Sequence, residues 1–170
     1  FNEQAYLQLG TLYIAREQPD KAIELFDEAI ELKPEFARAY SERGRAKLMK
    51  GDKNGSVEDL KKALEELIDN YRCGHEKATI NLDFQLKDPE IFADPFHLIH
   101  LVDNLISNAL KYAGEKAEIQ ITCKQEKPNK LLISVKDNEP GVSTHSRKRI
   151  FRTGFHSNHR HQNSHGIGLA

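Results

Sequence analysis

The residues best suited to do chemistry lie in the segment 97–112. Written on a helix of 3.6 residues per turn, this segment places Asn104, Asn108 and Lys111 on one face, together with His97 and His100. A merely solvated helix face normally carries Lys and Glu, because Asn is a mediocre helix former. Two asparagines one turn apart, followed by a lysine, therefore indicate a surface that donates and accepts hydrogen bonds and coordinates a ligand. The alternative is an ordinary solvated face of an amphipathic helix.

Two other short segments carry groups that suit a nucleotide. Asp137 comes directly after a predicted strand, and a turn containing Gly141 follows it. A carboxylate in this place can accept a hydrogen bond from an exocyclic amine, and glycine lets a ligand approach the backbone. Near the end of the chain, Gly166 and Gly168 form a Gly-x-Gly sequence whose backbone N–H groups suit phosphates. Each pattern also occurs in many ordinary turns.

Three strands are expected to support these groups. Residues 78–84, 119–123 and 131–135 each alternate apolar and polar side chains, which is typical of a half-buried strand. The turn formers Pro128 and Asn129 lie between the last two strands, so we expect these strands to form an antiparallel hairpin.

A helix is expected between the first strand and this hairpin. Asp94 and Pro95 are a suitable cap and first-turn pair for it. Strand, helix and hairpin together predict an α+β layer, in which one helix face packs on the sheet and the amide face points outward. The packed face is expected to consist of four apolar residues, Leu98, Leu101, Leu105 and Ala109.

The first part of the chain repeats itself with a period of 34 residues. The period aligns five pairs of residues: Tyr6 with Tyr40, Gly10 with Gly44, Ala22 with Ser56, Phe26 with Leu60, and Ala29 with Ala63. Such a period is the mark of stacked helical hairpins. We expect the first hairpin to be broken at 18–20 and closed by Pro34. The second should be broken at 51–55 and end with a helix over 56–70.

These residues resemble the tetratricopeptide repeat. The first unit fills its signature positions with Tyr6, Leu9, Gly10, Tyr13, Ala22, Phe26, Ala29 and Pro34. The second unit departs from the signature at Arg43 and Lys47, which replace an apolar and an aromatic residue, and at Ile68, which replaces the closing proline.

The resemblance implies a surface that binds a protein or peptide, with Tyr6, Tyr13 and Tyr40 as candidates. A purely structural spacer is the alternative. Because two repeats bury little surface on their own, we expect the helix around 57–71 to pack on the following domain or on a second copy of the chain.

Composition excludes several classes of protein. The chain has 170 residues and a net charge of -1, with basic and acidic residues interspersed, so no nucleic-acid partner is expected. It has no apolar run of membrane-spanning length and no visible export signal. We expect a cytoplasmic segment, whose parent protein could still be anchored in a membrane. Cys73 and Cys123 lack the spacing of metal ligands.

Taken in order, four motifs within residues 77–170 resemble the ATP-binding domain of sensor histidine kinases. This is a Bergerat-type domain that gyrase and the heat-shock chaperone ATPases share. Residues 104–112 are similar to the N box of the family, and the segment from Asp137 to Gly141 is similar to its first glycine box. Residues 150–155 are similar to the phenylalanine box and 166–169 to the second glycine box.

The resemblance implies a role for each matched residue. Asn108 would supply an oxygen to a magnesium ion that bridges the ATP phosphates, with Asn104 assisting. Lys111 would neutralise phosphate charge, Tyr112 would lie against the adenine, and Asp137 would bind the exocyclic amine. The other implied ATP-binding residues belong to the later boxes: Gly141, Phe155, Gly166, Gly168 and Leu169.

Several departures from the family pattern bear on activity. Asn104 stands where the hydrolases of the superfamily carry a Glu that activates water, so we expect inefficient hydrolysis and transfer of phosphate to a histidine outside this chain. Glu139 replaces the first glycine of its box, and Asp103 stands where an apolar residue usually packs. The sequence reaches Ala170 before the helix and two strands that follow in the family, so we expect a domain that is incomplete or that another chain completes.

Histidines offer two further candidates. His75 and Glu76 imitate the family's phosphoacceptor box, but only about thirty residues separate them from the N box, so we expect His75 in a connector. Four histidines near the end of the chain could be drawn as metal ligands, but without a nearby carboxylate or Cys a solvated lid is expected. They are His156, His159, His161 and His165.

We therefore interpret residues 1–72 as two helical repeats, and 73–170 as a C-terminally incomplete ATP-binding domain with α + α/β architecture. The first functional hypothesis is the ATP-binding module of a two-component sensor histidine kinase, with a phosphoacceptor domain and a response regulator as partners. The alternatives are a non-catalytic scaffold, a truncated or engineered fusion with a vestigial nucleotide site, and an ATPase switch. A homodimer is left open.

Overall fold

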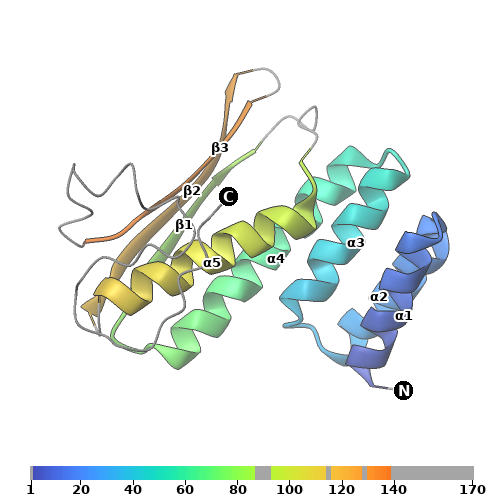
Figure 1. The fold of residues 1–170 in the computed structure, drawn as a ribbon, viewed down its shortest axis with the longest axis horizontal. Helices are drawn as coiled ribbons and strands as arrows, with labels where there is room; N and C mark the ends of the chain where they lie inside the picture. The colour runs from blue at the N-terminus through green and yellow to red at the C-terminus, as the bar shows by residue number, and fades with distance from the viewer. Residues whose placement is uncertain (1, 87–92, 114–115, 128–129, 139–170) are drawn as a thin grey trace, which may run out of the picture. The chain divides into compact units, whose positions relative to one another are not determined.

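The computed structural model describes residues 2–86, 93–113, 116–127 and 130–138, without the side chains of residues 112, 113 and 127. Four helices come first: α1 (Glu3–Ala15), α2 (Pro19–Leu32), α3 (Ala37–Met49) and α4 (Lys53–Gly74). They are followed by β1 (Thr79–Gln85), α5 (Pro95–Ala113), β2 (Glu118–Lys127) and β3 (Lys130–Lys136) (Figure 1). This order confirms the predicted α + α/β class. None of the described helices is long and apolar enough to cross a membrane.

Helices α1 and α2 form the first predicted hairpin. The side chain of Asn2 begins α1 by accepting a hydrogen bond from the N–H of Ala5 at 2.9 Å. Pro19 is the first residue of α2, where its missing N–H leaves no hydrogen bond unmade. Gly10 lies so close to the ring of Phe26 that a methyl group there would overlap it. The small residue at position 10 therefore lets these two helices approach closely.

One predicted core position of the first repeat is wrong. Leu9 is 42% exposed, whereas Leu7 and Ile14 are the buried apolar residues of α1. One period later, Arg43 lies at the equivalent position and reaches α2 across the boundary between the repeats. Leu9 belongs to the face of α1 that points away from its own hairpin.

The second repeat keeps the backbone of the first, and its break is shorter than predicted. Glu17 and Gly51, which are one period apart, both have positive φ values, 55° and 83°. The predicted break at 51–55 is too long, because Asp52 caps the next helix by accepting a hydrogen bond from the N–H of Gly55 at 2.9 Å. Helix α4 therefore begins at Lys53 and continues to Gly74, beyond the predicted end at residue 70.

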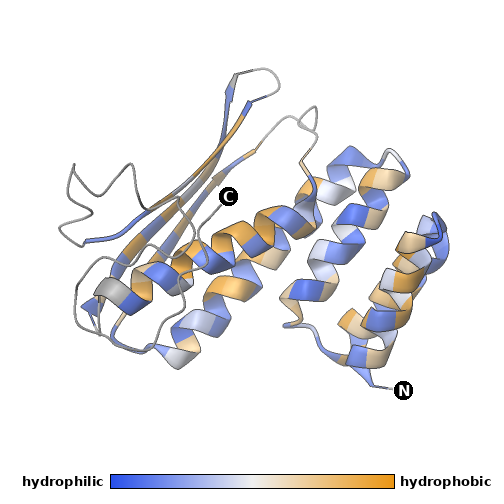
Figure 2. Cartoon of the chain, viewed as in Figure 1, coloured by the Kyte–Doolittle hydropathy of each residue, from blue (hydrophilic) through white to orange (hydrophobic). Residues whose placement is uncertain are grey.

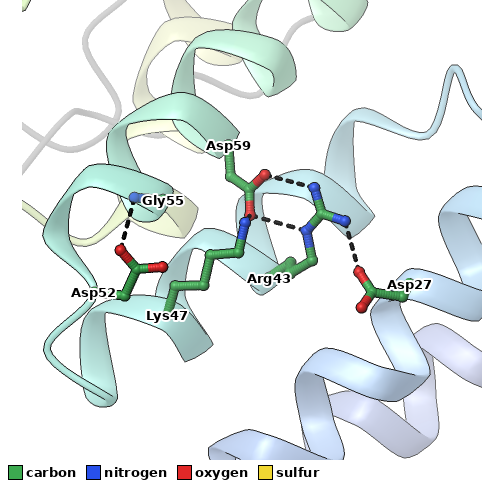
Figure 3. Close-up of polar contacts among 6 residues, drawn as sticks. All are labelled: Asp27, Arg43, Lys47, Asp52, Gly55 and Asp59. Atoms are coloured by element: carbon green, nitrogen blue, oxygen red, sulfur yellow. Dashed lines mark hydrogen bonds and ion pairs between the residues drawn. The ribbon is translucent and has the colours of Figure 1, made fainter.

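The two charged residues that break the repeat signature form a buried ion network (Figure 3). Arg43 donates two hydrogen bonds to the carboxylate of Asp59, at 2.6 and 2.9 Å, and a third to Asp27 on α2. The Nζ atom of Lys47 lies 2.9 Å from the same carboxylate of Asp59, whose side chain is only 4% exposed. Arg43 and Lys47 thus join α3 to α4, and Arg43 also joins α3 to α2.

The sheet has the strand order β1-β2-β3 among the described residues. β1 pairs in parallel with β2, with Ile80 opposite Ile119, and β2 pairs antiparallel with β3, with Ile121 opposite Val135. The three predicted strands and the predicted hairpin are confirmed. The guanidinium of Arg72, at the end of α4, donates to the backbone oxygen of Ile80 on the outer edge of β1.

A single cluster of buried side chains connects α3, α4, α5 and the sheet. It extends from Tyr40 through Leu64 and Ile68 of α4 to Ile106 of α5 and Ile121 of β2. The expectation that the last repeat helix packs on the following domain is therefore confirmed. The proposed division of the chain between residues 72 and 73 stays a prediction, and this core extends across it.

The predicted packed face of α5 is only partly correct. Ala109 is buried, but Leu101 is 38% exposed and Leu98 and Leu105 are only half buried. Much of α5 is hydrophobic (Figure 2), and contact with α4 as well as the sheet decides which of its apolar residues lie inward. The residues that α5 buries in the core are Ile99, Val102, Ile106, Ala109 and Leu110.

The ion network predicts a specific loss of stability. Asp59→Ala leaves the partly buried cations of Arg43 and Lys47 without their shared carboxylate, so we expect the free energy of unfolding to fall by about 3 kcal/mol. Asp20→Ala is the control, because it breaks only the exposed ion pair of Asp20 with Lys50 on another helix. It should change the free energy of unfolding little. Urea denaturation of both variants measures this, and equal effects of the two would contradict the prediction.

Candidate functional site

The start of α5 is fixed by its own cap and by α3. Asp94 accepts a hydrogen bond from the N–H of Phe96 at 2.9 Å, as the Asp-Pro pair predicted. The second carboxylate oxygen of Asp94 lies 3.3 Å from Nε of Arg45 on α3. Pro95 is fully buried, and a Cβ at Gly44 would be only 3.2 Å from its Cγ. Close approach at Gly44 thus lets the repeat helix α3 contact the first turn of α5.

The polar face of α5 is solvent-exposed. Asn104, Asn108 and Lys111 are all exposed, as are His97 and His100. The rings of both histidines contact Phe96, with centroid distances of 5.4 Å for His97 and 4.4 Å for His100. The amide side chains of Asn104 and Asn108 therefore face solvent, while the histidines pack around an aromatic ring.

Asp103 does not lie on this polar face. Its Oδ1 accepts a hydrogen bond of 2.7 Å from the hydroxyl of Tyr71 on α4. Burial, together with this hydrogen bond, raises the pKa of Tyr71 to about 12. Asp103 is the one acidic residue of α5, and its engagement with Tyr71 explains how a carboxylate is accommodated where an apolar residue was expected.

Asp137 follows directly after β3 and is exposed. Because β3 is antiparallel to β2, Asp137 lies at the end of the sheet where β2 begins. In the sequence, β2 is the element that follows α5. The next residue, Asn138, holds this corner together: its Oδ1 accepts from the N–H of Glu118 at 3.1 Å, and its Nδ2 donates to the oxygen of Lys116 at 3.2 Å. Sequence reasoning missed this role of Asn138, because an asparagine after a strand is common in turns.

Other predicted site residues lie outside the described part of the chain. The backbone of Tyr112 is in α5, but its side chain is not described. Outside the described residues lie Gly141, Phe155, Gly166, Gly168 and Leu169, together with Glu139, His156, His159, His161 and His165. In the described ranges, no group of three or more His, Cys, Asp and Glu side chains could hold a metal ion.

The remaining candidates lie on or beside the repeats. His75 directly follows α4 and is exposed, with Nδ1 3.1 Å from the backbone oxygen of Tyr71. Tyr6 and Tyr13 are partly exposed on α1. Tyr40 is only 8% exposed and belongs to the core, with the guanidinium of Arg43 5.4 Å from its ring centroid. Its inclusion in a partner-binding face is therefore wrong, because the core covers its ring.

Comparison with known proteins agrees with this arrangement. A family model described as "Histidine kinase-, DNA gyrase B-, and HSP90-like ATPase" matches residues 93–170, which begin at the cap of α5. Residues 93–170 are therefore similar to a segment of this ATPase family. A model of the tetratricopeptide repeat matches residues 3–36, which contain α1 and α2. Both predicted resemblances are confirmed.

The relatives of this chain are sensor kinases. It is 32% identical over 108 residues to the adaptive-response sensory kinase SasA of Trichormus variabilis, covering 63% of this chain and 26% of that protein. It is 33% identical over 98 residues to the sensor protein RprX of Bacteroides fragilis, covering 55% of this chain and 18% of that protein. The chain thus spans about a quarter or less of the length of these relatives.

The fold has a solved counterpart. The mycobacterial sensor histidine kinase MprB superposes with a TM-score of 0.54 at 20% sequence identity, covering 62% of this chain and 68% of that chain. The family match and the relatives support a histidine-kinase-type ATP-binding module, and the solved structure supports its fold. The tetratricopeptide repeat joined to it indicates protein partners in general.

A buried carboxylate lies close to where α3 meets this module. Glu42 of α3 is 2% exposed, and its Oε2 accepts no hydrogen bond in the described structure, with Nη1 of Arg45 3.8 Å away. Burial raises the pKa of Glu42 above its usual value of 4.5, and the positive charges of Arg45 and Arg38 only partly oppose this. A carboxyl group whose pKa is raised by folding stabilises the protein when protonated and loses that contribution as pH rises.

Glu42→Gln should therefore be more stable than the wild type at pH 8, because it replaces a buried charge with a neutral side chain of the same shape. The advantage should shrink as pH falls toward 4.5, the usual pKa, since the wild-type carboxyl then becomes protonated. Urea denaturation at pH 8 and pH 4.5 measures the difference. A variant that is less stable than the wild type at pH 8 would show that the pairing with Arg45 dominates.

Proposed function

We propose that residues 93–170 bind ATP with magnesium along the polar face of α5, and that the chain transfers the γ-phosphate to a histidine of another domain or protein. The observation that carries this proposal is the exposure of Asn104, Asn108 and Lys111 along one side of a helix whose other side is buried, in a segment that matches an ATPase family. The sensor-kinase relatives support a histidine as the acceptor.

The chemistry of α5 fits magnesium and phosphate. Amide oxygens are hard ligands of the kind that magnesium accepts, and a bound magnesium ion would neutralise the charge of the phosphates. We assign Asn108 as its main protein ligand, with Asn104 assisting, and Lys111 as a partner of the phosphates. Tyr112 and Asp137 are proposed to hold the adenine. The later residues Gly141, Phe155, Gly166, Gly168 and Leu169 complete the proposed set.

Transfer is favoured over hydrolysis because α5 has no carboxylate on its polar face beside the asparagines. An amide at position 104 cannot take a proton from water. The one carboxylate of α5, Asp103, lies on the flank of the helix and accepts a hydrogen bond from Tyr71.

A phosphoacceptor domain and a response regulator are the proposed partners. A cytoplasmic location is proposed for this segment.

Substitution of Asn108 tests the nucleotide site. Asn108→Ala should weaken binding of a fluorescent ATP analogue with magnesium about tenfold or more, because an oxygen ligand of the metal is lost. Asn70→Ala is a matched control, since Asn70 is an exposed asparagine on α4 away from the proposed face. This variant should bind the ATP analogue with the same affinity as the wild type. Equal or absent binding in the wild type and Asn108→Ala would overturn the assignment.

A second candidate function belongs to the repeats. We propose that the face of α1 around Tyr6 and Tyr13 binds a protein partner, and the exposure of Leu9 and Leu12 on the same helix, 42% and 46%, favours it. A scaffold of this kind would hold its partner with or without ATP, whereas a kinase module would require nucleotide for phosphate transfer. Partner binding that persists without nucleotide distinguishes the two.

A further inference from the structure

Helix α5 is held by side chains that come from the repeat helices. We infer that Tyr71 of α4 and Asp103 of α5 form a positioning pair that sets the rotation of α5 about its own axis, and so directs Asn104 and Asn108 toward the nucleotide. The inference rests on the proposed function, because it concerns how the same ATP site is held. The two residues are positioning residues, since neither lies on the polar face of α5.

The first argument is the place of the contacts along α5. The hydroxyl of Tyr71 donates to Oδ1 of Asp103 at 2.7 Å and lies 3.4 Å from the backbone oxygen of Asp103. Ser107, one turn later, is near enough to the Tyr71 hydroxyl to lower its pKa slightly against the effect of burial. Asp103 directly precedes Asn104 in the sequence, and Ser107 directly precedes Asn108. Tyr71 is therefore bonded to the neighbour of Asn104 and lies close to the neighbour of Asn108.

The second argument is that a directional contact is needed here. The other contacts of α5 with the core come from apolar side chains such as Ile99, Val102 and Ile106. Hydrophobic packing is non-directional, so it tolerates small rotations of a helix better than a hydrogen bond does. Successive residues of a helix are about 100° apart, so fixing Asp103 against α4 turns the side chain of Asn104 away from α4.

The third argument is that a second polar contact between α5 and the repeats lies at the start of the helix. Arg45 of α3 pairs with Asp94, ahead of the first turn of α5. That pair fixes where the helix begins, whereas Tyr71 acts beside the asparagines. Because the pKa of Tyr71 is raised to about 12, its hydroxyl stays protonated and able to donate across the physiological range of pH.

The test compares nucleotide affinity among variants that differ by single polar groups. Tyr71→Phe removes only the hydroxyl, and Asp103→Ala removes the acceptor, so each should weaken binding of the fluorescent ATP analogue with magnesium about three- to tenfold. Asp103→Asn keeps an oxygen that can accept from Tyr71, so it should bind nearly as well as the wild type. Asn70→Ala, at an exposed position on α4 next to Tyr71, is the control and should have no effect.

Two further measurements separate positioning from general stability. Affinities are compared at a temperature at which denaturation curves show every variant to be fully folded, where a loss of stability alone does not change the dissociation constant. The double variant Tyr71→Phe/Asp103→Ala should bind no more weakly than the weaker single variant, because both changes remove one interaction. Without nucleotide, the side-chain amide NMR signals of Asn104 and Asn108 should shift in Tyr71→Phe and not in Asn70→Ala.

The outcomes distinguish this inference from the proposed function. If Asn108→Ala loses binding while Tyr71→Phe and Asp103→Ala keep wild-type affinity, the positioning pair is overturned and the ATP site stands. Additive losses in the double variant would also overturn the pair. If the wild type binds no ATP analogue, the proposed function fails and the inference fails with it.

Discussion

Helix α5 can bury only one side, and the rest of the structure depends on which side that is. Burying Ile99, Val102 and Ile106 against α4 and the sheet contributes about 1.5–3 kcal/mol for each side chain. The same contact leaves the side with Asn104, Asn108 and Lys111 in solvent. Hydrophobic burial and presentation of the polar side chains are therefore consequences of a single packing arrangement.

This arrangement also joins the repeats to the ATPase-family segment. Helix α4 completes the second hairpin on one side, through Asp59, and packs on α5 and β1 on the other. Because the buried cluster is continuous from Tyr40 to Ile121, the second repeat and α5 share one core. A partner that displaces α3 or α4 would act directly on the packing of α5.

Much of this fold could be predicted from local sequence patterns. Alternation located the three strands, Asp94 and Pro95 located the start of α5, and the 34-residue period located the hairpins. The buried side of α5 could not be chosen in this way, because apolar residues occupy two adjacent sides and the contact with α4 decides between them. The roles of Arg43 and Lys47 were also hidden, because their shared carboxylate lies on another helix.

The candidate site shows the same limit. Residue types alone identified Asn104, Asn108 and Asp137 as candidate ligand-binding groups, because the local structure does not require an amide or a carboxylate at these positions. The residues that hold them were not recognisable, because Tyr71 meets Asp103 across 32 positions and Asn138 meets Glu118 across 20. Tyrosine and asparagine are common in helices and turns respectively, so only the folded chain reveals these pairs.

The hydrogen bond from Arg72 to Ile80 bears on whether copies of this molecule aggregate through their sheets. In the described sheet, β1 is an outer strand, and an outer strand with open backbone groups is a template on which another chain can add a strand. The guanidinium already occupies one of these backbone oxygens and places a positive charge beside it. The end of α4 thus makes this edge a poor starting point for aggregation.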